Sequence, residues 1–501
     1  MTERPSPLPD LAWDADRAGR FGERTVELWR EWLARLPGLP VWHAGTAAQV
    51  RKAVALDVPA APMAEDELFA YLRDMVFESS FYPGHPRFLA YVSGAGTIPG
   101  AAADLLAAGL NMNAGAWILA PSATEIEQQL IGFFAAQFGL PAGTAGGLLT
   151  SGGAMATFAA LKAARDDRAG WNVREDGVAA GAPLVLYLSE ETHVVSVRAA
   201  DMLGLGRRSV RRIAVDEEYR IGVDLLRDAI RADRAAGRRP FAVAVSAGTV
   251  ATGAVDPLND VADVCADEHV WMHVDGAYGG PAAFTEDLRP LFDGIERADS
   301  IAFDPHKWLY TPHSGGCVVV RDARLLRDAF SVTAGYVKQD RESTGRGEDF
   351  GQMGPQFSRG FQALKVWVSL LAHGWDPYRA RISHDAALAR YLGERVTERL
   401  EFELACPVGL SICCFRFVPP GLPAGSDRDA YLDKLNERLM TEVQQDGRVF
   451  YSNAILGDRY VLRVCIVNFR TEADDLDAVL EVTAEIGTRL DAEMRPAELR
   501  G

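Results

Sequence analysis

The sequence predicts an α/β fold: a large domain with a mixed, mostly parallel sheet, followed by a smaller C-terminal α+β domain. Between residues 95 and 320, short apolar runs alternate with helical stretches, which is typical of strand–helix–strand units in a parallel sheet. After residue 385 the pattern changes to a few strands flanked by helices. The length of 501 residues is sufficient for two or three domains.

The N-terminal part of the chain predicts helices without a core of their own. Residues 15–36 carry apolar side chains at helical spacing, and residues 66–76 predict a second helix. Because this segment is too small to bury its own apolar face, we expect it to pack on a second subunit. We therefore divide the chain into a helical segment packing on the dimer partner, a large domain and a small domain, at residues 1–95, 96–384 and 385–501.

The predicted strands of the large domain place its ligand. They comprise residues 183–189, 241–248, 270–276, 300–304 and 316–322, while residues 411–418 and 460–469 predict strands of the small domain. In open parallel sheets, ligands bind beyond the carboxyl ends of the strands. A polar, Gly-rich segment at 337–354 predicts either disorder or a mobile active-site loop before a helix resumes after Phe361.

Composition excludes several classes of function. The formal net charge of -17 argues against binding to nucleic acid or to anionic membrane surfaces. The six cysteines form no CxxC pair, so we expect reduced thiols and no metal site. We find no signal peptide and no apolar run of membrane-spanning length, and we therefore expect a cytoplasmic protein.

Four chemically distinctive features follow predicted strands. A Ser-Gly-Gly turn at 151–153 opens a helix, His193 follows the strand at 183–189, Asp275 ends an apolar run and Lys307 follows another. Each alone has an ordinary structural explanation. Together, an anion-binding helix start, a histidine, an aspartate and a lysine at one edge of a sheet are what pyridoxal 5'-phosphate (PLP) requires.

The motifs around these residues also resemble those of a known family. "DPHKWLYTP" resembles the Asn/Asp-x-His-Lys-Trp signature of the group II PLP-dependent decarboxylases, the aromatic L-amino-acid decarboxylase family, and "HVDGAYGG" resembles a second motif of that family. Similar segments follow in the family's order from about residue 15 to 490. The resemblance implies the PLP-dependent transferase fold type I, PLP as cofactor and a homodimer with a shared active site.

The resemblance also implies roles for residues around the cofactor ring. Lys307 would form the Schiff base, and Asp275 would pair with the pyridine nitrogen. Ala277 would pack under the ring, and His193 would stack on it. Thr249 would form a hydrogen bond near the ring or with Asp275.

Two further sets of residues follow from the same resemblance. The phosphate would be held by one turn and one side chain, namely Ser151, Gly152, Gly153, Ala154 and His306. The family has Ser or Thr where Ala154 stands, so one hydroxyl contact to the phosphate is absent. Tyr91, Asn113 and Trp117 match segments that line the substrate pocket.

The implied reaction is decarboxylation of an L-amino acid, most plausibly an aromatic one, to an amine and CO2. The animal and plant enzymes donate the final proton from a loop tyrosine. Counting back the family interval of eleven residues from Phe361 reaches Phe350, which has no such proton. Three hypotheses therefore stay open: amine formation with His193, water or another donor; O2-dependent formation of an aldehyde, ammonia and peroxide; and PLP binding without catalysis.

Overall fold

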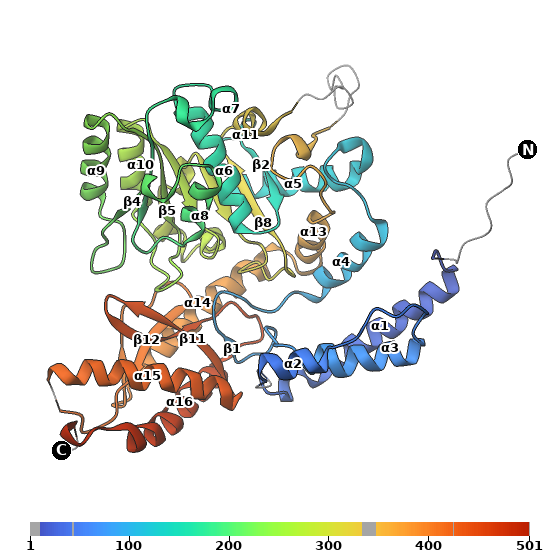
Figure 1. Cartoon of the computed structure of the whole chain (residues 1–501), viewed down its shortest axis with the longest axis vertical. Coiled ribbons are helices and arrows are strands. Elements are labelled where there is room, and N and C mark those ends of the chain that lie inside the picture. The colour runs from blue at the N-terminus through green and yellow to red at the C-terminus, as the bar shows by residue number, and fades with distance from the viewer. Residues whose placement is uncertain (1–10, 43–44, 333–346, 424, 500–501) are drawn as a thin grey trace, which may run out of the picture.

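The computed structural model describes residues 11–42, 45–332, 347–423 and 425–499, which build two β-sheets (Figure 1). The larger sheet has seven strands in the order β2-β8-β7-β6-β5-β3-β4, and the smaller has five in the order β1-β11-β12-β10-β9. The helices α1 to α3 extend away from both sheets as an arm (Figure 1). The predicted domain boundaries at residues 96 and 385 stay predictions. Residue 385 lies inside helix α14.

The seven-stranded sheet is mixed and mostly parallel, as the sequence predicts. Five neighbouring strands, β4, β3, β5, β6 and β7, are mutually parallel, whereas β8 lies antiparallel to both β7 and β2. The strands are β2 (Gly146–Thr150), β3 (Leu184–Ser189), β4 (Val210–Ile213), β5 (Arg239–Ser246), β6 (Trp271–Asp275), β7 (Ser300–Phe303) and β8 (Gly316–Val320).

Helices surround this sheet. They are α4 (Ile98–Leu110), α5 (Pro121–Gln137), α6 (Gly153–Arg168), α7 (Val173–Asp176), α8 (Val195–Met202), α9 (Val223–Ala235), α10 (Leu258–Asp267), α11 (Ala323–Phe330), α13 (Ala363–His373) and α14 (Trp375–Thr397). Among the described residues, no helix is long and apolar enough to cross a membrane.

The core of the large sheet lies on both of its faces. Along β5, Val243 and Val245 belong to the apolar cluster that includes side chains of α5, whereas Ala242 and Ala244 belong to the cluster around α6. This alternation follows from the two-residue period of a strand, and it explains why the strands are apolar throughout. With both faces covered, the carboxyl ends of the parallel strands are the edge where polar side chains meet.

The smaller sheet and its helices form the C-terminal part. Its strands are β1 (Phe88–Leu89), β9 (Phe402–Leu404), β10 (Ile412–Phe417), β11 (Phe450–Leu456) and β12 (Arg459–Cys465), and its helices are α15 (Ser426–Asp446) and α16 (Ala473–Met494). β1 pairs in parallel with β11, which ties residues before the large sheet to this C-terminal part. The predicted strands at 411–418 and 460–469 correspond to β10 and β12.

The N-terminal arm contains the predicted helices. They are α1 (Ala15–Arg35), α2 (Ala47–Ala53), α3 (Glu65–Tyr71) and a π-helical turn at Leu72–Phe77. Of the Gly-rich segment 337–354, residues 337–346 lie outside the described residues, and Phe350–Gln352 form a short 3-10 helix.

Candidate active site

A cavity of about 450 Å³ opens at the carboxyl ends of the parallel strands. The large sheet contributes Ser246 and Asp275 to its lining, and the smaller sheet contributes residues 452–455 and Arg463. Six residues predicted from the sequence line it together: Tyr91, His193, Thr249, Asp275, Ala277 and Lys307. These residues come from five separate segments, since Asp275 and Ala277 share one, and only the tertiary fold brings them together.

Lys307 lies in a turn after β7, and its amine is paired. Its Nζ lies 3.0 Å from Oδ2 of Asp304, and its backbone N–H donates to the carbonyl of the same residue. Trp308 anchors the turn: it is fully buried, stacks on Tyr278 at a centroid distance of 5.1 Å and donates its indole N–H to Asp385. This anchoring fixes where the lysine side chain enters the cavity.

Asp275 is the last residue of β6 and is buried, with 6% of its surface exposed. Its Oδ1 accepts a hydrogen bond from the backbone N–H of Ala277 at 3.1 Å. The hydroxyl of Thr249 lies 2.9 Å from that of Thr252 and accepts from the N–H of Ala254. Thr249 therefore lines the cavity. The hydrogen bonds of its hydroxyl that the structure describes are made within its own turn, to Thr252 and Ala254.

His193 lies between β3 and α8, and its ring is exposed to the cavity. Its Nδ1 accepts from the backbone N–H of Val195 at 3.3 Å. Protein surrounds much of the ring, and this partial desolvation lowers its pKa; the nearby Lys307 charge acts in the same direction, while Asp275 opposes it. The imidazole is consequently neutral near pH 7.

The glycine turn lies beside the cavity and contacts Asp304. Helix α6 begins at Gly153 without a side-chain cap. A Cβ at that glycine would lie 2.9 Å from Oδ2 of Asp304, so a larger residue would clash there. His306 faces the turn and forms a hydrogen bond with the carbonyl of Gly315. Of the predicted phosphate residues, Gly153 and His306 thus lie next to the same carboxyl group that pairs with Lys307.

Asn113, Trp117 and Phe350 form a separate group that does not line this cavity. Oδ1 of Asn113 accepts from the N–H of Arg359, and the N–H of Trp117 donates to Asp349 at 2.8 Å. Phe350 is 2% exposed, with the Arg359 guanidinium 5.2 Å from its ring centroid. In this chain, the residue at the predicted proton-donor position is therefore a buried packing residue.

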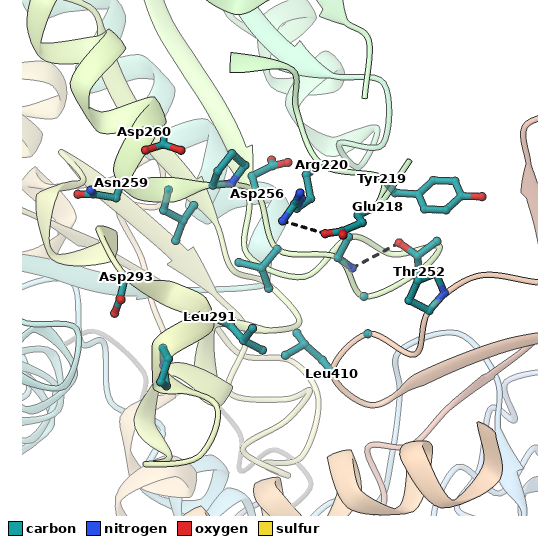
Figure 2. Close-up of a pocket in the computed structure, with 18 of the residues that line it drawn as sticks. Glu218, Tyr219, Arg220, Thr252, Asp256, Asn259, Asp260, Leu291, Asp293 and Leu410 are labelled. Atoms are coloured by element: carbon teal, nitrogen blue, oxygen red, sulfur yellow. Dashed lines mark hydrogen bonds and ion pairs between the residues drawn. The ribbon is translucent and has the colours of Figure 1, made fainter. Parts of the chain in front are cut away.

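A larger cavity, of about 570 Å³, is lined by other segments, among them residues 218–220 and 252–260 (Figure 2). It is rich in carboxylates, and Glu218 pairs there with Arg220 at 2.9 Å. Asp256 is buried in its wall and accepts from two backbone N–H groups, of Ile221 and Ser246. None of the predicted site residues lines this cavity, so size alone does not identify the active site.

Sequence comparison assigns the chain to a family. The model of the family described as "Pyridoxal-dependent decarboxylase conserved domain" matches residues 48–418. The chain belongs to this family. The fold is accordingly fold type I, the cofactor is PLP and the reaction class is amino-acid decarboxylation.

Individual relatives of this pyridoxal-dependent decarboxylase extend the match over the whole chain. An aromatic-L-amino-acid decarboxylase of Bacillus atrophaeus is 35% identical over 93% of this chain and 95% of its own length. A phenylacetaldehyde synthase of a Rosa hybrid cultivar is 26% identical, covering 92% of both chains. The structure of Oryza sativa TDC with PLP and tryptamine superimposes with a TM-score of 0.90 at 27% identity, covering 96% of this chain and all of the other.

The residues of this decarboxylase fit PLP. The cavity combines an amine, a buried carboxylate and an imidazole, as a Schiff-base lysine, a pyridine-nitrogen partner and a ring-stacking group require. Beside it, the uncapped start of α6 faces a second buried carboxyl, and Oδ1 of Asp304 has no hydrogen-bond partner among the described residues. A phosphate group at this helix start would accept hydrogen bonds from the free N–H groups of the helix.

Sequence reasoning missed two residues. Asp304 stands inside the quoted lysine motif but has no role there. Arg463 of β12 lines the cavity, is 2% exposed and donates to the carbonyl of Tyr91 at 2.8 Å. Its position more than 150 residues after Lys307 gives no local signal, and the resembling segment "YVLRVCIVNF", in which it lies, is the one feature that could have pointed to it.

Proposed function

We propose that this decarboxylase acts on an aromatic L-amino acid and releases the corresponding amine and CO2. The main observation behind this proposal is that Lys307, Asp275 and Arg463 line one cavity, together with an apolar wall. The wall includes Val92, Val250, Tyr278 and Ile455. Once Lys307 serves the cofactor and Arg463 a carboxylate, no permanent cation of the described lining is left for an acidic side chain, which favours an apolar substrate.

Lys307 would attach PLP, and Asp275 would hold a proton on the pyridine nitrogen. PLP then supplies an electron sink for the pair of electrons that CO2 leaves behind. Because Asp275 is buried, its negative charge faces little competing solvent and stabilises the protonated nitrogen strongly. Ser151 to Ala154 and His306 would hold the phosphate, and Ala277 and Thr249 would border the ring.

Arg463 would bind the substrate's α-carboxylate. Its Nη1 and Nε already donate to Tyr91, Ser452 and Ala251, while its buried Nη2 has no hydrogen-bond partner in the part of the chain that the structure describes. An arginine fixed in this way is a rigid donor for a carboxylate. Holding that group in place orients the C–C bond that breaks.

A proton must then reach the α-carbon of the product. Two groups of the cavity are placed for this step: Tyr91, whose exposed side chain ends in a phenolic hydroxyl, and His193. The hydroxyl would donate directly or through water, and the neutral imidazole would relay a proton from water. This supports the amine as product.

A second product is favoured by one observation. Phe350 is buried away from the cavity and has no acidic proton, so the loop tyrosine of the family has no replacement at that position. The similarity to a phenylacetaldehyde synthase makes an O2-dependent aldehyde the competing outcome. It would release CO2, ammonia and peroxide.

A panel of amino acids separates these outcomes. We expect aromatic L-amino acids to give CO2 and amine in equal amounts without loss of dissolved O2, because the cavity contains proton donors. Assays of CO2, O2, amine and aldehyde on each substrate check this. Turnover confined to glutamate or aspartate would contradict the aromatic substrate, and O2 consumption matched by aldehyde would establish the second product.

We further propose a homodimer in which each active site draws on both subunits. Large apolar side chains around α4 are between 50% and 62% exposed, namely Leu105, Leu106, Leu110, Ile118 and Leu119. Such a patch is typical of a protein interface. Asn113 and Trp117 adjoin it, so in a dimer they would reach the partner's cavity. The helices of residues 1–95, which extend as an arm, would pack on the partner (Figure 1).

Replacing Leu106 by Asp tests the dimer. Leu106 is 62% exposed, so its replacement leaves the monomer's core intact but places a charge in the proposed interface. We expect light scattering to show monomers and the decarboxylase activity to fall at least tenfold. Leu225→Asp on α9, where the leucine is 54% exposed, is the matched control and should stay dimeric and active. A fully active Leu106→Asp dimer would refute the assignment of this face.

A further inference from the structure

We infer that Asp304 takes up the proton that Lys307 loses when the cofactor attaches, and that the neutral Asp304 carboxyl then faces the cofactor phosphate. The inference rests on the proposed attachment of PLP to Lys307. It adds a proton acceptor for cofactor loading, a step separate from turnover of the amino acid.

The geometry places Asp304 between the two groups concerned. The residue follows β7 and is 2% exposed. Its Oδ2 lies 3.0 Å from Nζ of Lys307, within direct proton-transfer distance. Its Oδ1 is buried and lacks a hydrogen-bond partner among the described residues. Both oxygens lie against Gly153, where a Cβ would be 2.9 Å and 3.1 Å from them, at the start of α6.

The loading step balances with this acceptor. Before loading, Lys307 is an ammonium paired with the Asp304 carboxylate. One proton passes from Nζ to Oδ2, and the freed electron pair of the nitrogen attacks the aldehyde carbon of PLP. The aldehyde oxygen leaves as water with the two remaining nitrogen protons, and a C=N bond forms. Without Asp304, the first proton would have to leave for bulk water.

The transferred proton also explains how a carboxyl group tolerates a phosphate. Two negative groups this close to a helix start would repel each other. A protonated carboxyl is neutral and carries an O–H, and its unpartnered oxygen lies where an anion at the start of α6 would be. One proton on Oδ2 therefore removes the charge conflict.

The other charged or titratable groups around Asp304 do not replace this function. Those whose interactions with Asp304 the structure describes are Lys307, His306, His313, His193 and Cys317. Burial lowers the pKa of His193, His306 and His313 and raises that of Cys317. Among the contacts that the structure describes, only Asp304 lies within hydrogen-bond distance of Nζ of Lys307. Lys365, behind His306 and His313, already pairs with Asp104.

The experiment measures cofactor loading instead of turnover. Cofactor-free wild type and Asp304→Asn are mixed with PLP between about pH 7 and 8.5, and the rate is followed by absorbance. We expect a nearly flat profile for wild type, because the proton moves within the site. The Asn variant must release the proton to solvent, so its rate of PLP attachment should increase about tenfold for each unit by which the pH is raised. Asp293→Asn, in the other cavity, is the control and should load as wild type.

Borohydride reduction followed by peptide mass mapping locates the attachment site in each protein, and thermal unfolding verifies the fold of each variant. A flat profile in Asp304→Asn, with PLP on Lys307, would overturn the role of Asp304 and leave the proposed function intact. PLP attached to another residue in wild type would overturn both. A loading rate that rises about tenfold per pH unit in Asp304→Asn, but stays nearly constant in wild type, supports the inference.

Discussion

Replacing Lys307 by Ala should abolish the visible absorbance of covalently held PLP and lower kcat by at least about 10³-fold. The variant lacks the amine that attaches the cofactor. Absorbance spectra of the purified protein and CO2 release with the best amino acid of the panel measure both effects. A variant that retains the absorbance and the activity would refute the role of Lys307.

The alanine also leaves Asp304 without its counter-ion, which destabilises the fold by itself. A buried charge that loses its partner costs about 3–5 kcal/mol. Lys307→Arg therefore accompanies it: arginine keeps a positive charge near Asp304 but stays protonated and forms no Schiff base. We expect the Arg variant to unfold near the wild-type temperature and to be inactive. Lys434→Ala, at an exposed lysine of α15, controls for loss of a lysine elsewhere.

Replacing Asp275 by Asn should lower kcat by about 10³-fold while the cofactor stays attached. The amide keeps the shape and still accepts from the N–H of Ala277, but it carries no negative charge to hold a proton on the pyridine nitrogen. Steady-state kinetics give the activity, and borohydride reduction shows that PLP remains on Lys307. The combination distinguishes loss of chemistry from loss of cofactor.

The control for this variant is a carboxylate in the second cavity. Asp293→Asn makes the same chemical change away from Lys307, and we expect activity within about twofold of wild type, as for surface substitutions. Equal losses in the two variants would mean that Asp275 acts through general charge or stability. An Asp275→Asn enzyme with wild-type kcat would exclude a role for its charge.

Much of the fold was predictable because its elements have local signals. The apolar runs that became β3, β5, β6, β7 and β8 are short and bounded by turns, and the sequence placed each within two residues of its observed ends. The Ser-Gly-Gly turn before α6 was predictable for the same reason. The antiparallel placement of β8 was not, since strand periodicity contains no information about the direction of a neighbour.

The residues of the candidate site also fall into two groups: those recognisable from a local motif and those that depend on tertiary contacts. Lys307 and Asp275 were recognisable because each belongs to a contiguous motif at a strand end. Arg463 and the burial of Phe350 depend on contacts between segments far apart in the chain. Phe350, for example, is held below Arg359, which forms a buried ion pair with Glu127 of α5 at 2.6 Å. No spacing within the 337–354 segment indicates that pair.

The sequence by itself determined the α/β class, the PLP chemistry and the two residues on which that chemistry depends, because strand periodicity and contiguous motifs are local properties. Only the tertiary structure decided which segments share the cavity, that Asp304 pairs with Lys307 against α6, and that Asn113, Trp117 and Phe350 lie apart from it. The physical reason is that burial and proximity depend on how distant segments pack, and neither is written in the spacing of residues along one segment.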